Sequence, residues 1–231
     1  MLNEIILIAF FYLLFAYSII MHEVFHGYMA LWLGDATAKY AGRLTANPLK
    51  HIDLFSTIIL PIAMIFTLGI AFGGAKPVPY NPYNLRNQKW GPSFVALAGP
   101  GSNIILAIMF TVLAKLISLP VAIKIDIINN LRQADWSALA AVAQGSPATI
   151  LFMICAMVIF WNILIAIFNM IPFPPLDGSK LLFAVLPFKI ETLAIFEQYG
   201  FIFLLIFVFI FVGPLSALLN FFWQLFFGLT L

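Results

Sequence analysis

Two histidines and a glutamate interrupt an apolar run that extends from Ile5 to Leu33. They read His22-Glu23-Val-Phe-His26 and fall inside a stretch long enough to span a membrane. A charged or strongly polar side chain near the bilayer centre costs at least about 2.5–3.5 kcal/mol. Three such groups so close together need compensation, and the simplest compensation is a bound metal ion.

The spacing of the two histidines fits such an ion. Positions i and i+4 lie on one face of a helix, so His22 and His26 can reach the same metal. Glu23 lies beside them, where it can contact a metal-bound water rather than the metal. This is the His-Glu-x-x-His arrangement of zinc hydrolases, with two ligands and a general base. The pattern predicts one Zn²⁺ per chain; the competing interpretation is a buried polar patch whose histidines bond to carbonyl groups.

The composition is that of a membrane protein with several spans. Of the 231 residues, 64% are hydrophobic and 9% are charged, and the mean hydropathy is +1.08. The net charge of +2 and the lack of any basic cluster argue against a nucleic-acid partner. Asn3 and Glu4 stand where a signal peptide would be basic, so we do not expect cleavage at the N-terminus.

Four apolar stretches have the length of a membrane span. They are Ile5–Leu33, Phe94–Leu119, Ala148–Ile171 and Phe201–Leu229, and Gly213-Pro214 breaks the last, which could instead be a hairpin. A fifth stretch, Leu54–Phe72, has basic loops on both sides. Because Lys and Arg concentrate on the cytoplasmic side, we expect it to re-enter rather than cross. The expected fold is therefore an all-α bundle of four to six transmembrane helices with one re-entrant segment.

We expect a single domain over residues 1–231, with a catalytic core at about 5–182 and a C-terminal transmembrane segment at about 198–230. Segment 34–53 has turn residues at both ends and short alternating runs, which predicts a small β-ribbon near the active site. Within it, Asp35 is expected to be a turn or cap residue. His51 is expected to be an exposed loop residue, with a substrate-side role as the alternative.

A third metal ligand is expected from the segment Asn169-Met-Ile-Pro-Phe-Pro-Pro-Leu-Asp177-Gly178. Its three prolines remove backbone donors and unwind the helix that precedes them. Unwound backbone at membrane depth is tolerated only where it lines a cavity. Asp177 would lie just past the inner end of its span, at the depth of the two histidines, and we predict that it is the third ligand. The alternative is a capping or turn aspartate.

The two motifs together resemble the site-2 protease family of intramembrane zinc metalloproteases. Further stretches are similar to the short prokaryotic branch of that family, which lacks a PDZ domain: Gly34-Asp35-Ala-Thr-Ala, Gly42-Arg43-Leu-Thr-Ala-Asn-Pro-Leu-Lys-His-Ile-Asp53, Gly74-Ala-Lys-Pro-Val-Pro79 and Ala98-Gly-Pro-Gly-Ser-Asn103. The likeness covers roughly residues 18–182, and the longest outer loop, about 28 residues, is too short for a PDZ domain.

The resemblance implies an endopeptidase that hydrolyses peptide bonds in transmembrane segments of membrane proteins. His22, His26 and Asp177 match the family's zinc ligands, and Glu23 matches its catalytic glutamate. Asn169 matches an asparagine that holds the substrate backbone or the oxyanion. The expected partners are a transmembrane substrate and the lipid bilayer, and the sequence leaves the oligomeric state open.

We expect a multi-pass protein of the cell membrane with its active site toward the cytoplasmic side. Two other functions use the same residues. A membrane zinc or proton transporter is disfavoured because the sequence shows no repeated halves. An inactive relative that binds helices without cutting them is disfavoured because the general base, Glu23, is intact.

Overall fold

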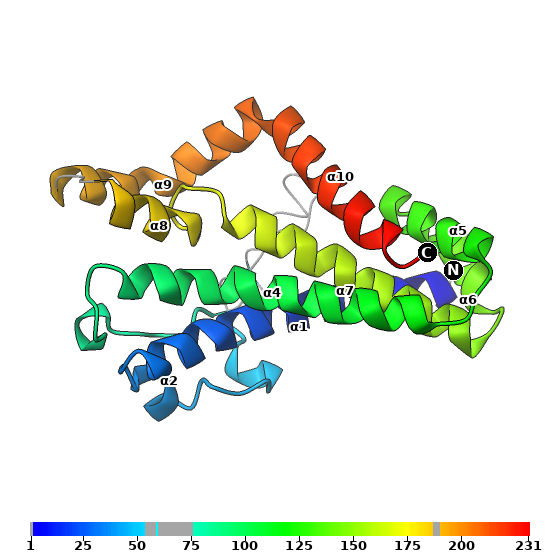
Figure 1. Ribbon diagram of the computed structural model, residues 1–231, viewed down its shortest axis with the longest axis horizontal. Helices are drawn as coiled ribbons and strands as arrows, with labels where there is room; N and C mark the ends of the chain where they lie inside the picture. Colours follow the sequence, from blue (N-terminus) through cyan, green and yellow to red (C-terminus); the bar gives the residue numbers. More distant parts are fainter. Residues whose placement is uncertain (1, 54–58, 60–75, 187–189) are drawn as a thin grey trace. The chain divides into compact units, whose positions relative to one another are not determined.

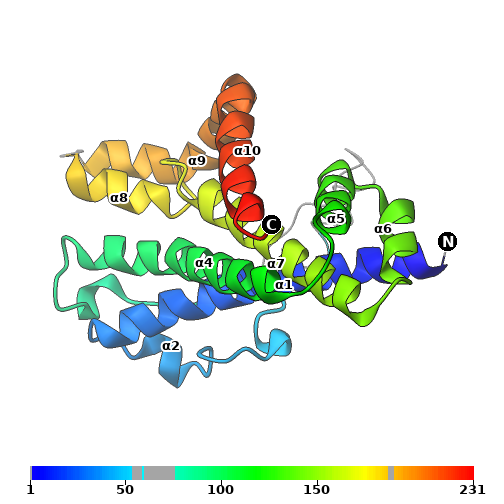
Figure 2. The same cartoon turned by 45° about the vertical axis from the view of Figure 1, so that its right-hand side comes forward.

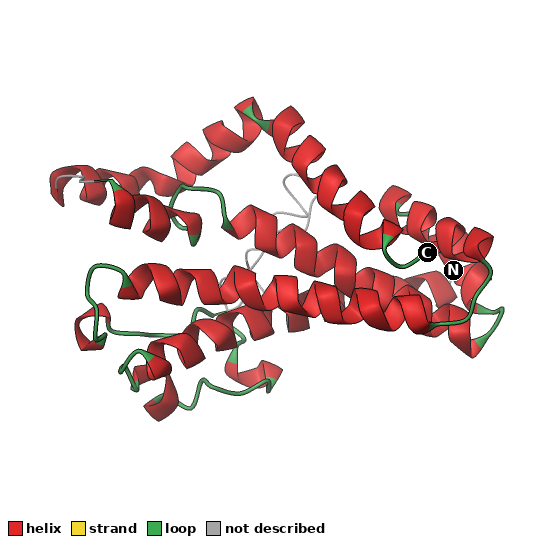
Figure 3. Ribbon diagram, in the orientation of Figure 1, coloured by secondary structure: helices red, strands yellow, loops and turns green. Residues whose placement is uncertain are grey.

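The computed structural model describes residues 2–53, 59, 76–186 and 190–231. In these residues every regular element is a helix and no strand is present (Figure 3). The predicted all-α class is therefore confirmed for the described part of the chain. The predicted re-entrant segment 54–72 lies, Ile59 apart, outside the described residues.

Three helices are long and apolar enough to cross a membrane (Figure 1): α1 (Leu2–Trp32), α4 (Gly91–Leu116) and α7 (Pro147–Asn169). The part of α9 (Ile190–Ile210) from Gln198 onward meets α10 (Val212–Gly228) at a bend of 77°, and the two count as a fourth span if they form one broken crossing. The protein is thus a multi-pass membrane protein. The described residues contain three or four spans, so the predicted range of four to six is not confirmed.

The predicted β-ribbon at 34–53 is wrong. The segment contains the one-turn helix α2 (Thr37–Tyr40), the 3₁₀ turn η1 (Pro48–Lys50) and irregular turns. Asn47 starts η1, because its side chain accepts a hydrogen bond from the Leu49 N–H at 3.0 Å. Gly42, at φ +63°, reverses the chain after α2. This turn chemistry interrupts the alternating runs before they can pair.

The chain divides into two compact units. The first contains residues 1–18, 103–168 and 204–231. Its core is centred on α7, whose Phe152, Met157 and Ile163 are fully buried. The shorter helices α5 (Val121–Gln133) and α6 (Trp136–Ala143) lie side by side in it (Figures 1 and 2).

A buried polar network joins three helices in this first unit. Asn103 of α4 donates to the Asn162 side-chain oxygen of α7 at 2.7 Å, and Asn162 donates to the Ser18 hydroxyl of α1 at 3.0 Å. All three side chains are buried. Ser18 lies one helical turn before His22, so these bonds fix the part of α1 that leads into the histidine pair.

The second unit contains residues 19–102 and 169–203. In it the loop that ends in η3 (Pro82–Asn84) is tied to the end of α1 by Asp35, which is fully buried. Asp35 accepts hydrogen bonds from the Asn81 N–H at 2.8 Å and the Asn84 side chain at 2.9 Å. It also accepts one from the Thr37 hydroxyl at 2.6 Å. Asp35 is thus a turn residue, as predicted, and in addition a link between two distant segments.

Candidate metal centre

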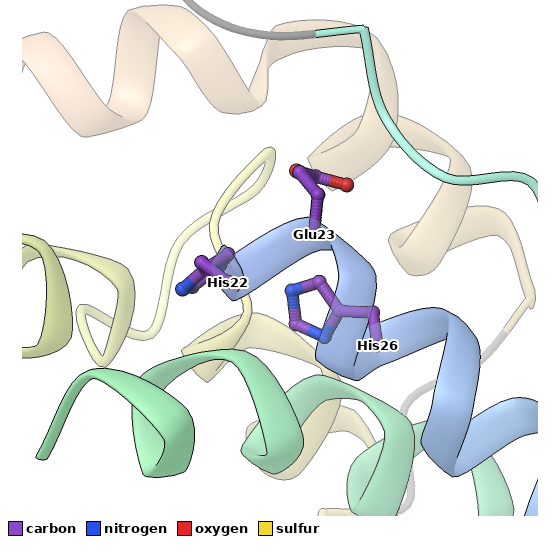
Figure 4. A group of neighbouring side chains, drawn as sticks. All are labelled: His22, Glu23 and His26. Atoms are coloured by element: carbon purple, nitrogen blue, oxygen red, sulfur yellow. The ribbon is translucent and has the colours of Figure 1, made fainter. Parts of the chain in front are cut away.

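The motif residues His22, Glu23 and His26 leave one stretch of α1 (Figure 4). The two imidazoles lie on the same side of the helix, with ring centroids 4.5 Å apart, and Glu23 leaves it in another direction. One potential ligand atom from each of the three side chains lies within 4.8 Å of the other two. Both histidines are buried and Glu23 is half-buried.

Asp177 reaches the histidines from the loop after α7. The loop turns sharply, because the Leu176 N–H donates to the Phe173 carbonyl at 3.0 Å, and the helix α8 (Gly178–Val185) starts directly behind Asp177. Only glycine fits at position 178, since a Cβ there would lie 2.6 Å from the Ile171 carbonyl oxygen. The turn places Asp177 Oδ2 3.0 Å from His22 Nε2 and 3.3 Å from His26 Nε2.

The ring nitrogens of His26 can be told apart by their partners. His26 Nδ1 lies 2.7 Å from the Val95 carbonyl oxygen, which only accepts hydrogen bonds. Nδ1 therefore carries the proton, and in the neutral ring the lone pair is on Nε2, the atom that faces Asp177. A carbonyl partner of this kind is the usual way in which a metal-binding histidine is held in one tautomer.

The three converging atoms fit Zn²⁺. Asp177 Oδ2 is buried, yet neither ring directs an N–H at it with the geometry of a hydrogen bond. Lone-pair atoms this close repel one another unless a proton or a metal ion lies among them. Neighbouring ligands of a tetrahedral zinc ion are about 3.3 Å apart, given Zn–N distances of about 2.0–2.1 Å. Two imidazole nitrogens and a carboxylate oxygen are also the donor types that catalytic zinc takes.

Gly99 of α4 allows this helix to approach the two imidazoles. A Cβ at position 99 would lie 2.5 Å from His26 Nε2 and 2.6 Å from His22 Cε1. No side chain fits there without moving the rings. Sequence reasoning did not identify Gly99 as a residue of the site. The available signal was its place in a run of small residues, a composition typical of close helix contacts in membranes.

Glu23 is held by a different segment. Its Oε2 accepts a hydrogen bond from the Val78 N–H at 2.8 Å. Val78 belongs to a proline-rich segment that is neither helix nor strand, and Pro77 and Pro79 on either side of it are exposed. Gly27, one turn after Glu23, makes room for this segment, since a Cβ there would lie 2.8 Å from Val78 Cγ1. The contact between Glu23 and Val78 was not predicted.

The charge of Asp177 affects its surroundings. Burial acts to raise the pKa of the Asp177 carboxyl, but without a metal ion a proton held between the carboxylate and the rings of His22 and His26 outweighs burial and keeps this pKa below its usual value. The same carboxylate affects Tyr80. Burial, and to a lesser extent the negative charge of Asp177, raise the pKa of the Tyr80 hydroxyl. Asp177 is therefore ionised at neutral pH, as a metal ligand must be.

Two further residues named from the sequence lie elsewhere. Asn169 is the last residue of α7, half-buried and eight residues before Asp177, and its role stays a prediction. The prediction that His51 is an exposed loop residue is wrong, because only 1% of its surface is accessible. Its Nε2 bonds to the Thr45 carbonyl at 2.8 Å, and its own carbonyl accepts the Lys76 N–H at 2.8 Å. It joins the loop before the undescribed stretch to the segment after it.

Comparison with known proteins adds independent evidence. The family model of "Peptidase family M50" matches residues 10–211, most of the chain. The chain belongs to this family, that of the site-2 proteases. The M50 chain is 34% identical over 201 residues to the "Putative zinc metalloprotease YwhC" of Bacillus subtilis, covering 87% of this chain and 78% of that protein.

Relatives named "Putative zinc metalloprotease Rip2" are more distant. The one from Mycolicibacterium smegmatis is 28% identical over 186 residues, 80% of this chain and 61% of its own length. The one from Mycobacterium tuberculosis strain H37Rv is 25% identical over 198 residues, 85% of this chain and 64% of its own length. The M50 chain thus spans less than two thirds of both Rip2 proteins. No solved structure gives a significant match.

The family fixes the class of protein and its cofactor. The chain is a membrane protein of a zinc metalloprotease family, and Zn²⁺ is the metal that this family implies. The predicted family and cofactor are confirmed. The predicted roles of the individual residues are not tested by these comparisons.

Proposed function

We propose that this M50 protein is an intramembrane zinc endopeptidase that hydrolyses peptide bonds in transmembrane segments of other proteins. The observation that carries the proposal is the position of Asp177 Oδ2, 3.0 Å and 3.3 Å from the Nε2 atoms of His22 and His26. Asp177 lies more than 150 residues after the two histidines in the sequence. Their convergence beside a candidate general base supports a hydrolytic metal centre rather than an isolated polar patch.

In the proposed mechanism His22, His26 and Asp177 hold the zinc ion. When bound, Zn²⁺ supplies a Lewis acid that polarises a carbonyl group and makes water a stronger acid. The charges of Zn²⁺, Asp177 and Glu23 sum to zero, which limits the penalty of burying them.

Glu23 moves the proton. Its carboxylate takes a proton from the attacking water and delivers it to the nitrogen of the broken peptide bond. The bond from the Val78 N–H occupies Oε2, so we assign proton transfer to the other oxygen, Oε1. The bond also fixes the rotation of the carboxylate, which reduces the reorganisation needed during reaction. We assign to Asn169 a contact with the substrate backbone or the oxyanion.

The substrate must be unwound before it is cut, because a helical backbone hides its carbonyl groups in i→i−4 hydrogen bonds. The proline-rich segment around Val78 is the proposed surface for an unwound chain. Pro77 and Pro79 are exposed and offer carbonyl oxygens but no N–H. A substrate strand bound there would have to supply the N–H donors itself. We place the site toward the cytoplasmic side of the cell membrane, on the distribution of basic loops.

The test is to purify the protein in detergent, measure its zinc content and follow cleavage of a model transmembrane peptide. We expect the Glu23→Gln variant to retain zinc but to lose about 10²–10⁴-fold in cleavage rate, the usual contribution of a general base. Glu4→Gln, the same change near the start of α1, serves as the control and should cleave like the wild type. Zinc flux in vesicles without cleavage, or peptide binding without cleavage by the wild type, would refute the proposal.

A further inference from the structure

The first half of α9 packs against the turn that presents Asp177. The turn runs from Phe173 to Leu176 and lies in the same compact unit as α9 up to residue 203. Phe196 of α9 places its ring centroid 6.5 Å from that of Phe173. It also lies 5.9 Å from the ring of Phe183 on α8, the helix that starts behind Asp177 (Figures 1 and 2 show α8 alongside α9). One aromatic side chain thus contacts both the turn and the helix that follows it.

Gly200, one helical turn after Phe196, is in direct contact with the centre of the turn. A Cβ at position 200 would lie 2.6 Å from Pro174 Cβ and 2.6 Å from the Pro174 carbonyl oxygen. Ordinary contacts of a Cβ begin at about 3.4 Å, so any side chain would push the two segments apart by about 0.8 Å. Neither neighbour is a flexible side chain, since one is a proline ring atom and the other is backbone.

The turn transmits such a shift to Asp177. Leu176 closes the turn through its N–H, and its carbonyl accepts the Ser179 N–H at 3.2 Å and the Ser179 hydroxyl at 2.6 Å. Asp177 lies between these anchored residues and has little freedom of its own. Metal sites need their ligands placed to within about 0.5 Å. A displacement of about 0.8 Å at Pro174 exceeds this tolerance.

We infer that Phe196 and Gly200 of α9 form a seat that positions Asp177 for zinc binding. Gly200 acts by the absence of a side chain and Phe196 by its contacts with Phe173 and Phe183; neither touches the metal. The inference rests on the proposed ligand role of Asp177. Through Gly200 it extends the metal site to the predicted C-terminal transmembrane segment at about 198–230, which was expected to lie outside the catalytic core.

The test compares two alanine variants of the α9–α10 pair. Gly200→Ala adds a Cβ against Pro174, whereas Gly213→Ala adds one where no atom lies within 4 Å. Zn²⁺ affinity is measured by competition with a chelator of known affinity, and the visible spectrum of bound Co²⁺ reports the coordination geometry. We expect Gly200→Ala to weaken Zn²⁺ binding about 10–100-fold, the usual effect of disturbing a group that orients a metal ligand. Gly213→Ala should match the wild type in both measurements.

A double-mutant cycle with Asp177→Ala separates a specific effect from general damage. If Gly200 acts through Asp177, adding Gly200→Ala to Asp177→Ala causes no further loss of Zn²⁺ affinity. An equal loss of Zn²⁺ affinity in both backgrounds, or wild-type affinity in Gly200→Ala, would refute the inference that α9 positions Asp177, while leaving the proposed function intact. If Asp177→Ala itself binds Zn²⁺ like the wild type, the proposed ligand set fails, and the seat fails with it.

A milder variant is available if Gly200→Ala does not yield a monodisperse protein in detergent. Phe196→Leu weakens the contacts with Phe173 and Phe183 without adding volume to α9. Its matched control is Phe209→Leu on the same helix, whose side chain is 85% exposed. In the same cycle, Phe196→Leu is expected to weaken Zn²⁺ binding only when Asp177 is present. Wild-type affinity in this folded variant overturns the contribution of Phe196.

Discussion

Replacing Gly99 by alanine tests how tightly α4 must approach the histidine pair. The added Cβ would lie 2.5 Å from His26 Nε2 and 2.6 Å from His22 Cε1, whereas ordinary contacts begin at about 3.4 Å. The two rings must therefore retreat by about 0.8–0.9 Å, or α4 must move away by as much. Either movement exceeds the tolerance of about 0.5 Å for a metal site. Either movement also disturbs the hydrogen bond from His26 Nδ1 to the carbonyl of Val95, which lies on α4 like Gly99.

We expect Gly99→Ala to lose at least about 10–100-fold in Zn²⁺ affinity, since displacing ligands costs no less than displacing the groups that orient them. The control is Gly101→Ala, two residues further along α4, where an added Cβ meets no atom within 4 Å. Both changes gain a similar helix preference. Melting of the zinc-free proteins in detergent shows whether each variant is folded.

The close approach of α4 to the imidazoles would be refuted if Gly99→Ala melts like the Gly101→Ala control without zinc and also binds Zn²⁺ with wild-type affinity. That result would mean that the imidazoles do not occupy the positions described when the metal is bound. A parallel loss in both glycine variants would instead point to a general effect of alanine in this helix. Neither result is expected, because the two positions differ only in what an added methyl group would touch.

Two further predictions concern stability. Lys124 is buried, and its ammonium donates to the carbonyl oxygens of Thr230 at 2.9 Å and Ala114 at 3.3 Å. Lys124→Met should therefore lower the stability measured in thermal melts by about 1.5–3 kcal/mol. Lys115 is exposed, so the control Lys115→Met should change the stability by less than about 0.5 kcal/mol. For Asp35, burial acts to raise the carboxyl pKa, but hydrogen bonds from Thr37, Asn84 and the Asn81 amide outweigh it and lower the pKa. A lowered folded-state pKa stabilises the fold above the unfolded value of about 3.9, and this stabilisation disappears as the pH falls through the folded-state pKa. The difference in melting temperature between the wild type and Asp35→Asn should therefore be constant above about pH 5 and become smaller as the pH falls below about 4. A difference that stays unchanged at still lower pH would contradict this prediction.

Much of the architecture could be predicted because lipid leaves the chain few choices. Apolar length alone located α1, α4 and α7, since each is a long apolar stretch that only a helix can carry across a membrane. The ligand types stood out for the same reason, because His22, His26 and Asp177 are costly in an apolar chain. The break near Gly213-Pro214 was also visible, and the structure places the bend between residues 210 and 212.

Contacts between distant segments could not be predicted in the same way. His51 was expected to be exposed because a histidine in a polar loop usually is, but its ring is buried against the Thr45 carbonyl. The expected β-ribbon failed because Asn47 and Gly42 favour turns that alternation of side chains does not reveal. Gly99 carries no chemical group, so its role depends entirely on what lies opposite it.

The helical offset between neighbouring residues separates the two tasks of the site. At about 100° per residue, Glu23 points about 100° from His22 and about 60° from His26, so it stands at the edge of the histidine face and can also reach a different neighbouring segment. The histidines face α4 at Gly99 and the loop at Asp177, whereas Glu23 faces the proline-rich segment at Val78. A change on the first face therefore alters metal binding, and a change on the second alters the base while the metal stays bound. Loss of zinc and loss of cleavage with zinc retained should thus be separable by variants of a single stretch of α1 and its two neighbours.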